Sequence, residues 1–195
     1  IKEYSFFFFF SDDNGKTYKE VGRVHEEPRA DRGAMQNRLV QGPSGRLYFA
    51  CSEENSESRG AERAYYSDDG GNTWKASETY IRFENTGFVI AEGKIIEMGD
   101  GIVRYYIRTD LGQIIYFESY DYGQTFDLTK AHSTPFLSAT NCYNVEVDPY
   151  NPDHIYIAWG YDNANLNSTV QHPRTRFGVA MSPDCGKTWH YIGTA

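Results

Sequence analysis

The sequence lacks a long apolar stretch and any concentration of positive charge. Its run of five phenylalanines, Phe6–Phe10, is far shorter than the ~20 residues that a membrane-spanning helix needs. The run predicts a buried strand instead. The formal net charge is −8 and the Lys and Arg residues are scattered, so no positive field would attract phosphates. We therefore expect neither a membrane span nor a nucleic-acid partner.

Cysteine and histidine are few and are not spaced as metal ligands. The three cysteines contain no CxxC pair, and the five histidines contain no HxH or HxxxH pair. We therefore expect no metal site and no cofactor. Three unpaired thiols are the favoured interpretation, and one disulfide with one free thiol is the alternative, for Cys51, Cys142 and Cys185.

The first residues do not form a signal peptide. Ile1 is followed by Lys2 and Glu3, and the absence of an initial Met suggests a processed or excised piece of a longer chain. A single N-glycosylation sequon begins at Asn167 and matters only in a secretory pathway. The location is left open, with a secreted or cell-surface protein favoured over a cytoplasmic one.

What the sequence does contain is a fourfold repeat. Four octapeptides fit the pattern S-x-D-x-G-x-T-aromatic, and their starts are 56, 52 and 63 residues apart. They are SDDNGKTY from Ser11, SDDGGNTW from Ser67, SYDYGQTF from Ser119 and SPDCGKTW from Ser182. An apolar or aromatic run precedes each one. Such a repeat indicates one structural unit that is used several times.

The chemistry of the repeat is that of a tight turn between two strands. Its aspartate can accept hydrogen bonds from backbone amides ahead of it, and its glycine supplies a positive φ. Its Ser and Thr hydroxyls can tie the two ends together. None of these functions needs a substrate. We assign a structural role, in preference to acid catalysis or calcium binding, to Asp13, Asp69, Asp121 and Asp184.

The spacing of the turns leaves room for four short strands in each period, and no amphipathic helical spacing is evident. Four strands about every 50 residues, repeated radially, are typical of a propeller. We predict an all-β fold, a β-propeller of four-stranded antiparallel blades with about three and a half blades in residues 1–195. The predicted blade parts are 1–24, 34–83, 84–131 and 139–195, and the third ends in a strand near Phe126 to Lys130.

Three and a half blades do not close a ring. Propellers close with four to eight blades, so two sheet edges would stay open, which favours aggregation. We expect the chain to be a section of a six-bladed propeller, completed by blades from a longer parent chain or from another copy. A compact sandwich of the same strands is the alternative.

The octapeptide resembles the Asp box, or bacterial neuraminidase repeat, of sialidases and of unrelated propellers such as the sortilin ectodomain. Segments between the boxes extend the resemblance to sialidases over nearly the whole chain. AEGKIIEMGDGIVRYYIRTDLGQIIYFESYDYGQTF is similar to the sialidase blade in which a Glu opens an inner strand and the next strand ends in Arg. The resemblance places Glu92 at the family's glutamate and Arg108 at the second arginine of its carboxylate-binding triad.

Two further segments carry the resemblance. HPRTRFGVAMSPDCGKTW resembles the segment with the triad's third arginine and places Arg174 there, with Arg176 as its rival. MQNRLVQGPSGRLYFA resembles an inner strand of sialidase propellers and places Arg38 at the channel, where a basic residue is also ordinary lining. Asp110 and Tyr106 are secondary candidates for the same cleft.

The resemblance implies an exo-acting sialidase that releases terminal sialic acid, or a related acidic sugar, from glycoconjugates. Guanidinium forks bind the carboxylate of such a sugar with paired, charge-assisted hydrogen bonds. Sialidases use a tyrosine nucleophile, and Glu92 would take its proton. On this alignment the first triad arginine and the Asp acid/base fall before Ile1, and the nucleophile falls after Ala195. Tyr143 is misplaced in its blade for that role.

Three functions compete. The first is the glycoside hydrolase, towards which we lean, with this chain supplying the central blades and part of the arginine cluster. The second is a catalytically silent carbohydrate-binding relative. The third is a protein-binding propeller with scattered, individually paired residues, in which Arg108 would pair with Asp110 or Asp121 at the surface and contribute little. The expected partner in the first two is an acidic glycan.

Overall fold

The fold is described from a computed structural model of the chain, which defines residues 5–25, 32–35, 38–54, 60–137, 143–161 and 176–194. These residues form sixteen β-strands and one short helix, α1 (Phe83–Thr86). Every strand pairing is antiparallel. Among the described residues no helix is long and apolar enough to cross a membrane.

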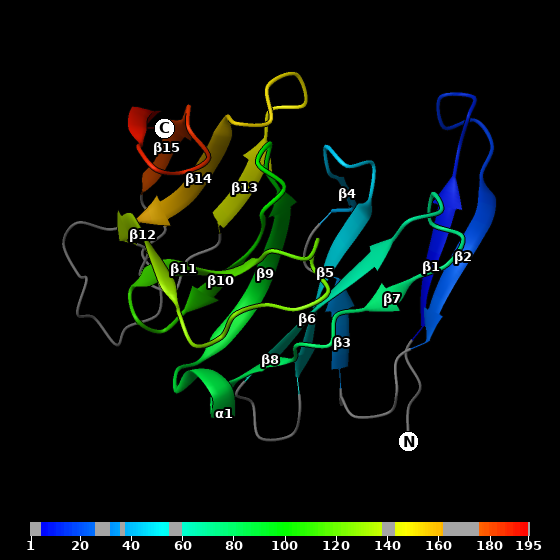
Figure 1. The fold of residues 1–195 in the computed structure, drawn as a ribbon. Helices are drawn as coiled ribbons and strands as arrows, with labels where there is room; N and C mark the ends of the chain where they lie inside the picture. Colours follow the sequence, from blue (N-terminus) through cyan, green and yellow to red (C-terminus); the bar gives the residue numbers. More distant parts are fainter. Residues whose placement is uncertain are drawn as a thin grey trace.

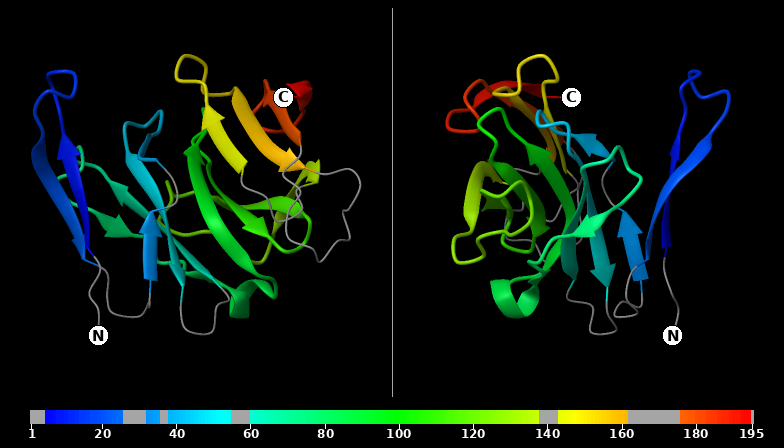
Figure 2. Two further views of the ribbon diagram at one scale, coloured as in Figure 1. Left: turned by 180° about the vertical axis from the view of Figure 1, so that it is seen from behind. Right: turned by 45° about the vertical axis from the view of Figure 1, so that its right-hand side comes forward.

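The strands gather into four sheets that follow one another in chain order, from β1–β2 to β13–β16 (Figures 1 and 2). The first sheet pairs β1 (Ser5–Phe10) with β2 (Lys19–His25). The second runs β3-β5-β6-β7 with β4 and β8 beside it, and its strands are β3 (Arg32–Met35), β4 (Val40–Gln41), β5 (Leu47–Glu54), β6 (Ala61–Ser67), β7 (Lys75–Ala76) and β8 (Ile81–Arg82).

The last two sheets each have four strands in sequence order. The third consists of β9 (Ile90–Glu97), β10 (Val103–Thr109), β11 (Gln113–Ser119) and β12 (His132–Leu137). The fourth consists of β13 (Tyr143–Val147), β14 (Ile155–Tyr161), β15 (Arg176–Ser182) and β16 (His190–Thr194). These sheets are blades, and the predicted all-β propeller of four-stranded antiparallel blades is confirmed. The pair β1–β2 forms half a blade.

Three apolar cores lie between successive blades, because side chains of a strand point alternately to its two faces. The core between the half-blade and the second blade contains Phe8, Phe49 and Tyr65. The core between the second and third blades includes Tyr48, Tyr66, Ile95 and Tyr105. The core between the third and fourth blades includes Ile96, Tyr106, Tyr143 and Trp159. Packing between blades therefore fixes how their ends align.

The four Asp boxes form one hydrogen-bonded turn repeated with nearly identical geometry. In each turn the Ser hydroxyl donates to the Asp carboxylate and accepts the Gly amide at 2.7–2.9 Å. The Thr amide and hydroxyl both donate to the same carboxylate at 2.6–2.9 Å. The Thr hydroxyl is the largest cause that lowers the pKa from 3.8 to about 2 for Asp13, Asp69 and Asp184.

The pKa of the aspartate in the remaining box is shifted in the same direction. Burial alone would raise the pKa of Asp121, but the bonds from Thr125 and Ser119 outweigh it and lower the pKa. In all four turns the Ser hydroxyl and the Thr amide and hydroxyl donate to the Asp carboxylate. These hydrogen bonds are thus made between groups of the same turn.

Two predictions about strands are wrong. Phe126 to Lys130 is not the last strand of the third blade, because Asp127 accepts the Thr129 amide at 2.9 Å and makes a second turn. That strand is β12, beyond the predicted boundary at residue 131. The phenylalanine run is a strand, but Phe7 and Phe9 are half exposed, because one face of the two-stranded half-blade has no neighbouring sheet among the described residues.

The cysteine prediction is tested only in part. Cys185 is buried and forms no disulfide, and its thiol lies 3.4 Å from the Asp153 carboxylate. Cys142 lies outside the described residues. The disulfide alternative therefore stays a prediction.

Candidate functional site

The third blade has two chemically distinct ends. In β10, Val103 lies opposite Ser119, which opens the Asp box, whereas Arg108 lies opposite Ile114 at the far end of the same ladder. Arg108 is five residues further along the strand than Val103, or about 16 Å at ~3.3 Å per residue. Arg108 and the Asp box are therefore at opposite ends of the blade.

A β-bulge interrupts β9 at the end that holds Arg108. The register between β9 and β10 shifts between Tyr106 and Arg108. Ile90 and Ile95 consequently both face the core towards the second blade, although strict alternation would place residues five apart on opposite faces. The extra residue of the bulge lies at Glu92 and Gly93.

Glu92 adopts a left-handed backbone conformation with φ of 54°. Among the described residues the other non-glycine positions with positive φ, namely Asn14, Tyr122 and Cys185, all precede the glycine of an Asp box. A left-handed Glu inside a strand costs about 1–3 kcal/mol and occurs where the surrounding structure imposes it. Such strain marks Glu92 as a candidate functional position.

The side chain of Glu92 pairs with Arg108. Arg108 Nη1 donates to Glu92 Oε1 at 2.7 Å, and the two side chains are 19% and 25% exposed. The alternative pairing of Arg108 with Asp110 or Asp121 is wrong. Asp110 accepts the Val89 amide at 3.1 Å, and Asp121 closes its box. The blade thus brings two of the predicted site residues together at one partly open position.

The peptide unit between Glu92 and Gly93 is bound by both neighbouring blades. Tyr143, from β13 of the fourth blade, donates its hydroxyl to the Glu92 carbonyl at 3.2 Å. Glu62, from β6 of the second blade, accepts the Gly93 amide. The peptide of the bulge is turned out of its own ladder, and side chains from either side satisfy its polar groups.

Burial controls the titration of both side chains that bind this peptide. Glu62 is almost fully buried, which raises its pKa to about 7 despite bonds from Ser52 and Tyr105. Burial, with the negative charges of Glu62 and Glu92, raises the pKa of Tyr143 well above its usual value. Tyr143 is therefore a neutral phenol that donates a hydrogen bond, and it lacks the activation that a nucleophile needs.

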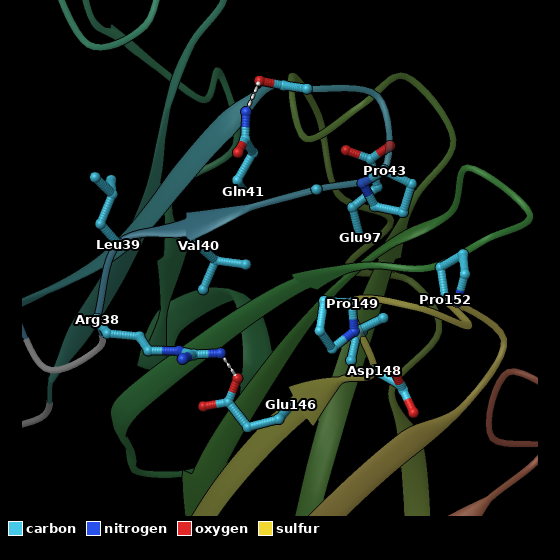
Figure 3. A pocket seen from close by; sticks show the side chains of 13 residues that line it. Arg38, Leu39, Val40, Gln41, Pro43, Glu97, Glu146, Asp148, Pro149 and Pro152 are labelled. Atoms are coloured by element: carbon cyan, nitrogen blue, oxygen red, sulfur yellow. Dashed lines mark hydrogen bonds and ion pairs between the residues drawn. The ribbon is translucent and has the colours of Figure 1, made fainter. Parts of the chain in front are cut away.

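Arg38 lies elsewhere. Its side chain is 63% exposed, and its guanidinium pairs with Glu146 of β13 (Figure 3). The pair lies at a cleft of about 560 Å³ whose lining includes Val40, Glu97 and Pro149 but neither Glu92 nor Arg108. Glu97 is opposite Val103, so this cleft reaches the Asp-box end of the blade. This cleft is thus separate from the Arg108–Glu92 pair.

Of the remaining candidates, the structure describes Arg176 and Tyr106. Arg174 lies outside the described residues, and its rival Arg176 opens β15 opposite Tyr161. Tyr106 is fully buried, because its position in β10 points into the core between the blades. Among the described residues no group of His, Cys, Asp and Glu is arranged to hold a metal ion.

Sequence reasoning missed the contacts that Glu62 and Tyr143 make with the peptide of the bulge. The one signal for Glu62 was a carboxylate inside the strand AERAYYS, at an alternation position shared with the inward-facing Ala64 and Tyr66. A buried charge at such a position calls for specific partners. Tyr143 gave no comparable signal, because a tyrosine in an inner strand is ordinary core.

Comparison with known proteins agrees with this fold. A profile of the family described as BNR repeat-like domain matches residues 2–194. The anhydrosialidase of Macrobdella decora is 31% identical over 129 residues, which cover 60% of this chain and 16% of that protein. The chain thus spans about a sixth of that relative's length.

Solved structures of glycosidases share the architecture. The Hadza microbial sialidase Hz136 is similar with a TM-score of 0.68 at 18% identity, covering 97% of this chain and 36% of that one. Trypanosoma rangeli sialidase has a TM-score of 0.62 at 18% identity, with 98% and 32% covered. The α-L-arabinofuranosidase arb93a of Fusarium graminearum has a TM-score of 0.61 at 15% identity, with 96% and 58% covered.

These structural likenesses establish the fold, and the profile match extends over nearly the whole chain. The chain therefore belongs to the BNR repeat-like domain family and has its sialidase-like β-propeller fold.

Proposed function

We propose that this chain forms the central part of a sialidase-type exo-glycosidase that releases terminal sialic acid or a related acidic sugar. In this proposal Arg108 binds the sugar carboxylate and Glu92 is the base for a tyrosine nucleophile outside the described residues. The observation that carries the proposal is the 2.7 Å pair of Arg108 and Glu92 on a strained bulge, at the blade end away from the Asp box.

The chemistry of the pair fits an anionic sugar. Among the described residues the Arg108 guanidinium makes one hydrogen bond, to Glu92, and a guanidinium has five N–H donors. The remaining donors can bind a carboxylate in the paired geometry that arginine favours. Partial burial strengthens such a bond without closing the position to a ligand. Glu92, already oriented by Arg108, is then placed beside the bound sugar.

The other arginines are assigned separately. Arg174 is the proposed third member of the cluster, and the propeller as a whole is proposed to contain six blades. We leave Arg38 out of the cluster, because Glu146 engages its guanidinium at another cleft. The domain is proposed to be one propeller segment with its blades near the predicted boundaries.

Solved structures of similar fold support an acidic sugar as the ligand. Trypanosoma rangeli sialidase has been solved in complex with sialic acid and as a covalent intermediate with 2,3-difluorosialic acid. The arabinofuranosidase shares the fold to a similar degree, so the fold itself does not select the sugar. The arginine of the site is the feature that favours a carboxylated ligand.

Binding of sialic acid tests the role of Arg108 directly. Titration calorimetry with this chain should show that Arg108→Ala weakens affinity by about ten- to hundredfold, the loss expected for a charge-assisted hydrogen bond of about 1.5–3 kcal/mol. Arg23→Ala is the matched control, because Arg23 also pairs with a glutamate, Glu20, but lies on β2. Equal affinity of wild type and Arg108→Ala would contradict the assignment.

Turnover separates the enzyme from the alternatives. The full-length protein should release sialic acid from a fluorogenic sialoside. Binding that depends on Arg108 without any turnover would instead establish a catalytically silent carbohydrate-binding propeller. The absence of both, in a folded protein, would favour a protein-binding Asp-box propeller.

A further inference from the structure

The backbone around Glu92 is held by two blades at once. The Glu92 carbonyl and the Gly93 amide belong to one peptide unit, which Tyr143 and Glu62 bind from opposite sides. We propose that Glu62 and Tyr143 are positioning residues that clamp this peptide and thereby aim the Glu92 carboxylate at Arg108. The inference rests on the proposed function for its effect on ligand binding, but the clamp is measurable without a ligand.

The bulge needs such a clamp. A bulge leaves one residue without ladder partners, and a left-handed Glu relaxes unless its surroundings hold it. A flip of the Glu92–Gly93 peptide would change the ψ of Glu92 and the φ of Gly93, and the bulge that holds the Glu92 carboxylate 2.7 Å from Arg108 would have to rearrange. Fixing the peptide at its oxygen and at its nitrogen opposes that flip.

Gly93 is seated tightly between its neighbours. A Cβ at this position would lie 2.3 Å from the ring of Tyr105 and 2.6 Å from Glu62 Oε2. The residue after Glu92 thus has no room for a side chain. Close approach of the backbone to Glu62 is what permits the hydrogen bond from the Gly93 amide.

The surroundings of Glu62 match an acceptor of several hydrogen bonds. Ser52 on β5 donates to Glu62 Oε1 at 2.5 Å, and Tyr105 on β10 donates to Oε2 at 2.9 Å. Lys94 on β9 is a cation that favours its ionised form, and Tyr143 on β13 faces it from the fourth blade. A carboxylate that is 1% exposed is costly to bury, and its hydrogen bonds account for its presence.

Titration of Glu62 makes the clamp observable. Its pKa of about 7 implies that the carboxylate is ionised above neutral pH and protonated below it. The proton must occupy one oxygen, so the bonds from Ser52, Tyr105 and the Gly93 amide rearrange. The Gly93 amide and the Arg108 side chain should therefore report the change.

Glu97 provides a matched control on the same strand as Glu92. It is also buried and accepts bonds from a serine and a tyrosine hydroxyl, Ser44 at 2.6 Å and Tyr48 at 2.9 Å. It lies at the Asp-box end of the blade and binds no peptide of the bulge. Glu97→Gln thus repeats the chemical change of Glu62→Gln away from the clamp.

The test follows the Gly93 amide and the Arg108 side chain by nitrogen-15 NMR between pH 5 and 9. In the wild type both signals should shift with a midpoint near 7. Glu62→Gln should abolish that step and Glu97→Gln should keep it. Tyr143→Phe should broaden or displace the Glu92 and Gly93 signals at every pH. A wild-type Gly93 signal without a step near pH 7 would overturn the clamp even if a variant fails to fold.

Sialic acid binding then distinguishes this inference from the proposed function. The affinity should rise severalfold from pH 6 to 8 in the wild type and in Glu97→Gln, and stay flat and severalfold weaker in Glu62→Gln. If wild type and both clamp variants bind equally, positioning is refuted and the proposed function stands. If the Gly93 step is present but the wild type binds no sialic acid, the clamp stands and the proposed function fails.

Discussion

The two ends of the third blade contain the same chemical groups in different states. At the Asp-box end, Arg104 pairs with Glu118 at 2.9 Å, with side chains 8% and 9% exposed. At the other end, Arg108 pairs with Glu92 at a similar distance but more than twice the exposure. Both arginines lie on β10, at alternation positions shared with Tyr106, which faces the core towards the fourth blade.

The surroundings explain why only one pair is a candidate site. Arg104 also donates to the Cys185 carbonyl at 2.7 Å and stacks on the ring of Tyr116, so its guanidinium joins two blades. Arg108 has the bulge and the strained Glu92 beside it. An ion pair alone is therefore weak evidence for a functional site. An ion pair that is partly exposed and lies beside a strained backbone is stronger evidence.

The largest expected difference between the two ends is the loss in the free energy of unfolding when each arginine is removed. Arg104→Ala leaves Glu118 buried without its cation and should lower the free energy of unfolding by about 3–5 kcal/mol. Arg108→Ala should lower it by about 1 kcal/mol or less, because its pair is partly solvated. Urea unfolding of both variants measures the difference. Equal losses would mean that the Arg108 pair is as structural as the other.

A side chain at Gly93 should have the next largest effect. Gly93→Ala places a methyl group against Tyr105 and Glu62, and such overpacking costs about 1–3 kcal/mol. The variant should also weaken sialic acid binding, because the Glu92 backbone must shift. Gly193→Ala is the control, since a Cβ there meets nothing within 4 Å. Indistinguishable unfolding curves for the two variants would contradict the close seating of Gly93.

Replacing Glu92 by glycine should not lower the free energy of unfolding, although glycine in a strand usually does. A glycine is not hindered at the φ of 54° that Glu92 adopts, so Glu92→Gly relieves strain that offsets the lost ion pair. We expect the free energy of unfolding to stay unchanged or to rise by about 1 kcal/mol, while sialic acid binding weakens. Glu20→Gly, in a strand at ordinary φ, should instead lose about 0.5–1 kcal/mol. A larger loss for Glu92→Gly in urea unfolding would mean that the bulge is unstrained.

The sequence allowed the fold to be predicted because the repeat depends on local spacing, and the resemblance to sialidases singled out Glu92 and Arg108 as candidates without predicting that they pair. The Asp boxes mark the end of one strand in each blade, and counting back from Ser119 reaches Arg108 on the preceding strand. The β12 strand was misplaced because Asp127 adds a second turn after its box, whereas β7 follows its box at Lys75 without one. A local hydrogen bond shifted that strand.

The clamp was beyond prediction because it depends on contacts between blades. Glu62 precedes Gly93 by thirty-one residues and Tyr143 follows it by fifty, and they meet only after three sheets have packed together. The bulge also breaks the alternation from which inward-facing residues are inferred. Arg38 shows the same limit, since its partner Glu146 comes from a blade two sheets away.

The aspartates of the Asp boxes should change the stability of the fold in a different pH range from Glu62. The effect of a single Asp box is the smallest of the predicted effects. The folded pKa of Asp13 is about 2, below its ordinary 3.8. Its stabilisation is therefore present above pH 3.8 and lost as the pH falls towards 2. The raised pKa of Glu62 acts in the opposite direction, between 4.5 and 7, so the two windows do not overlap.

Urea midpoints measured from pH 4.5 to 2 should consequently isolate the turns. Asp13→Asn should lower the midpoint at pH 4.5 and converge on the wild type near pH 2, because protonation removes the same charge. Asp12→Asn changes the same charge in the same turn without touching the carboxylate that binds Thr17, and it should keep the wild-type acid dependence. Parallel curves for Asp13→Asn and the wild type would show that the hydrogen bonds of the box do not depend on its ionised carboxylate.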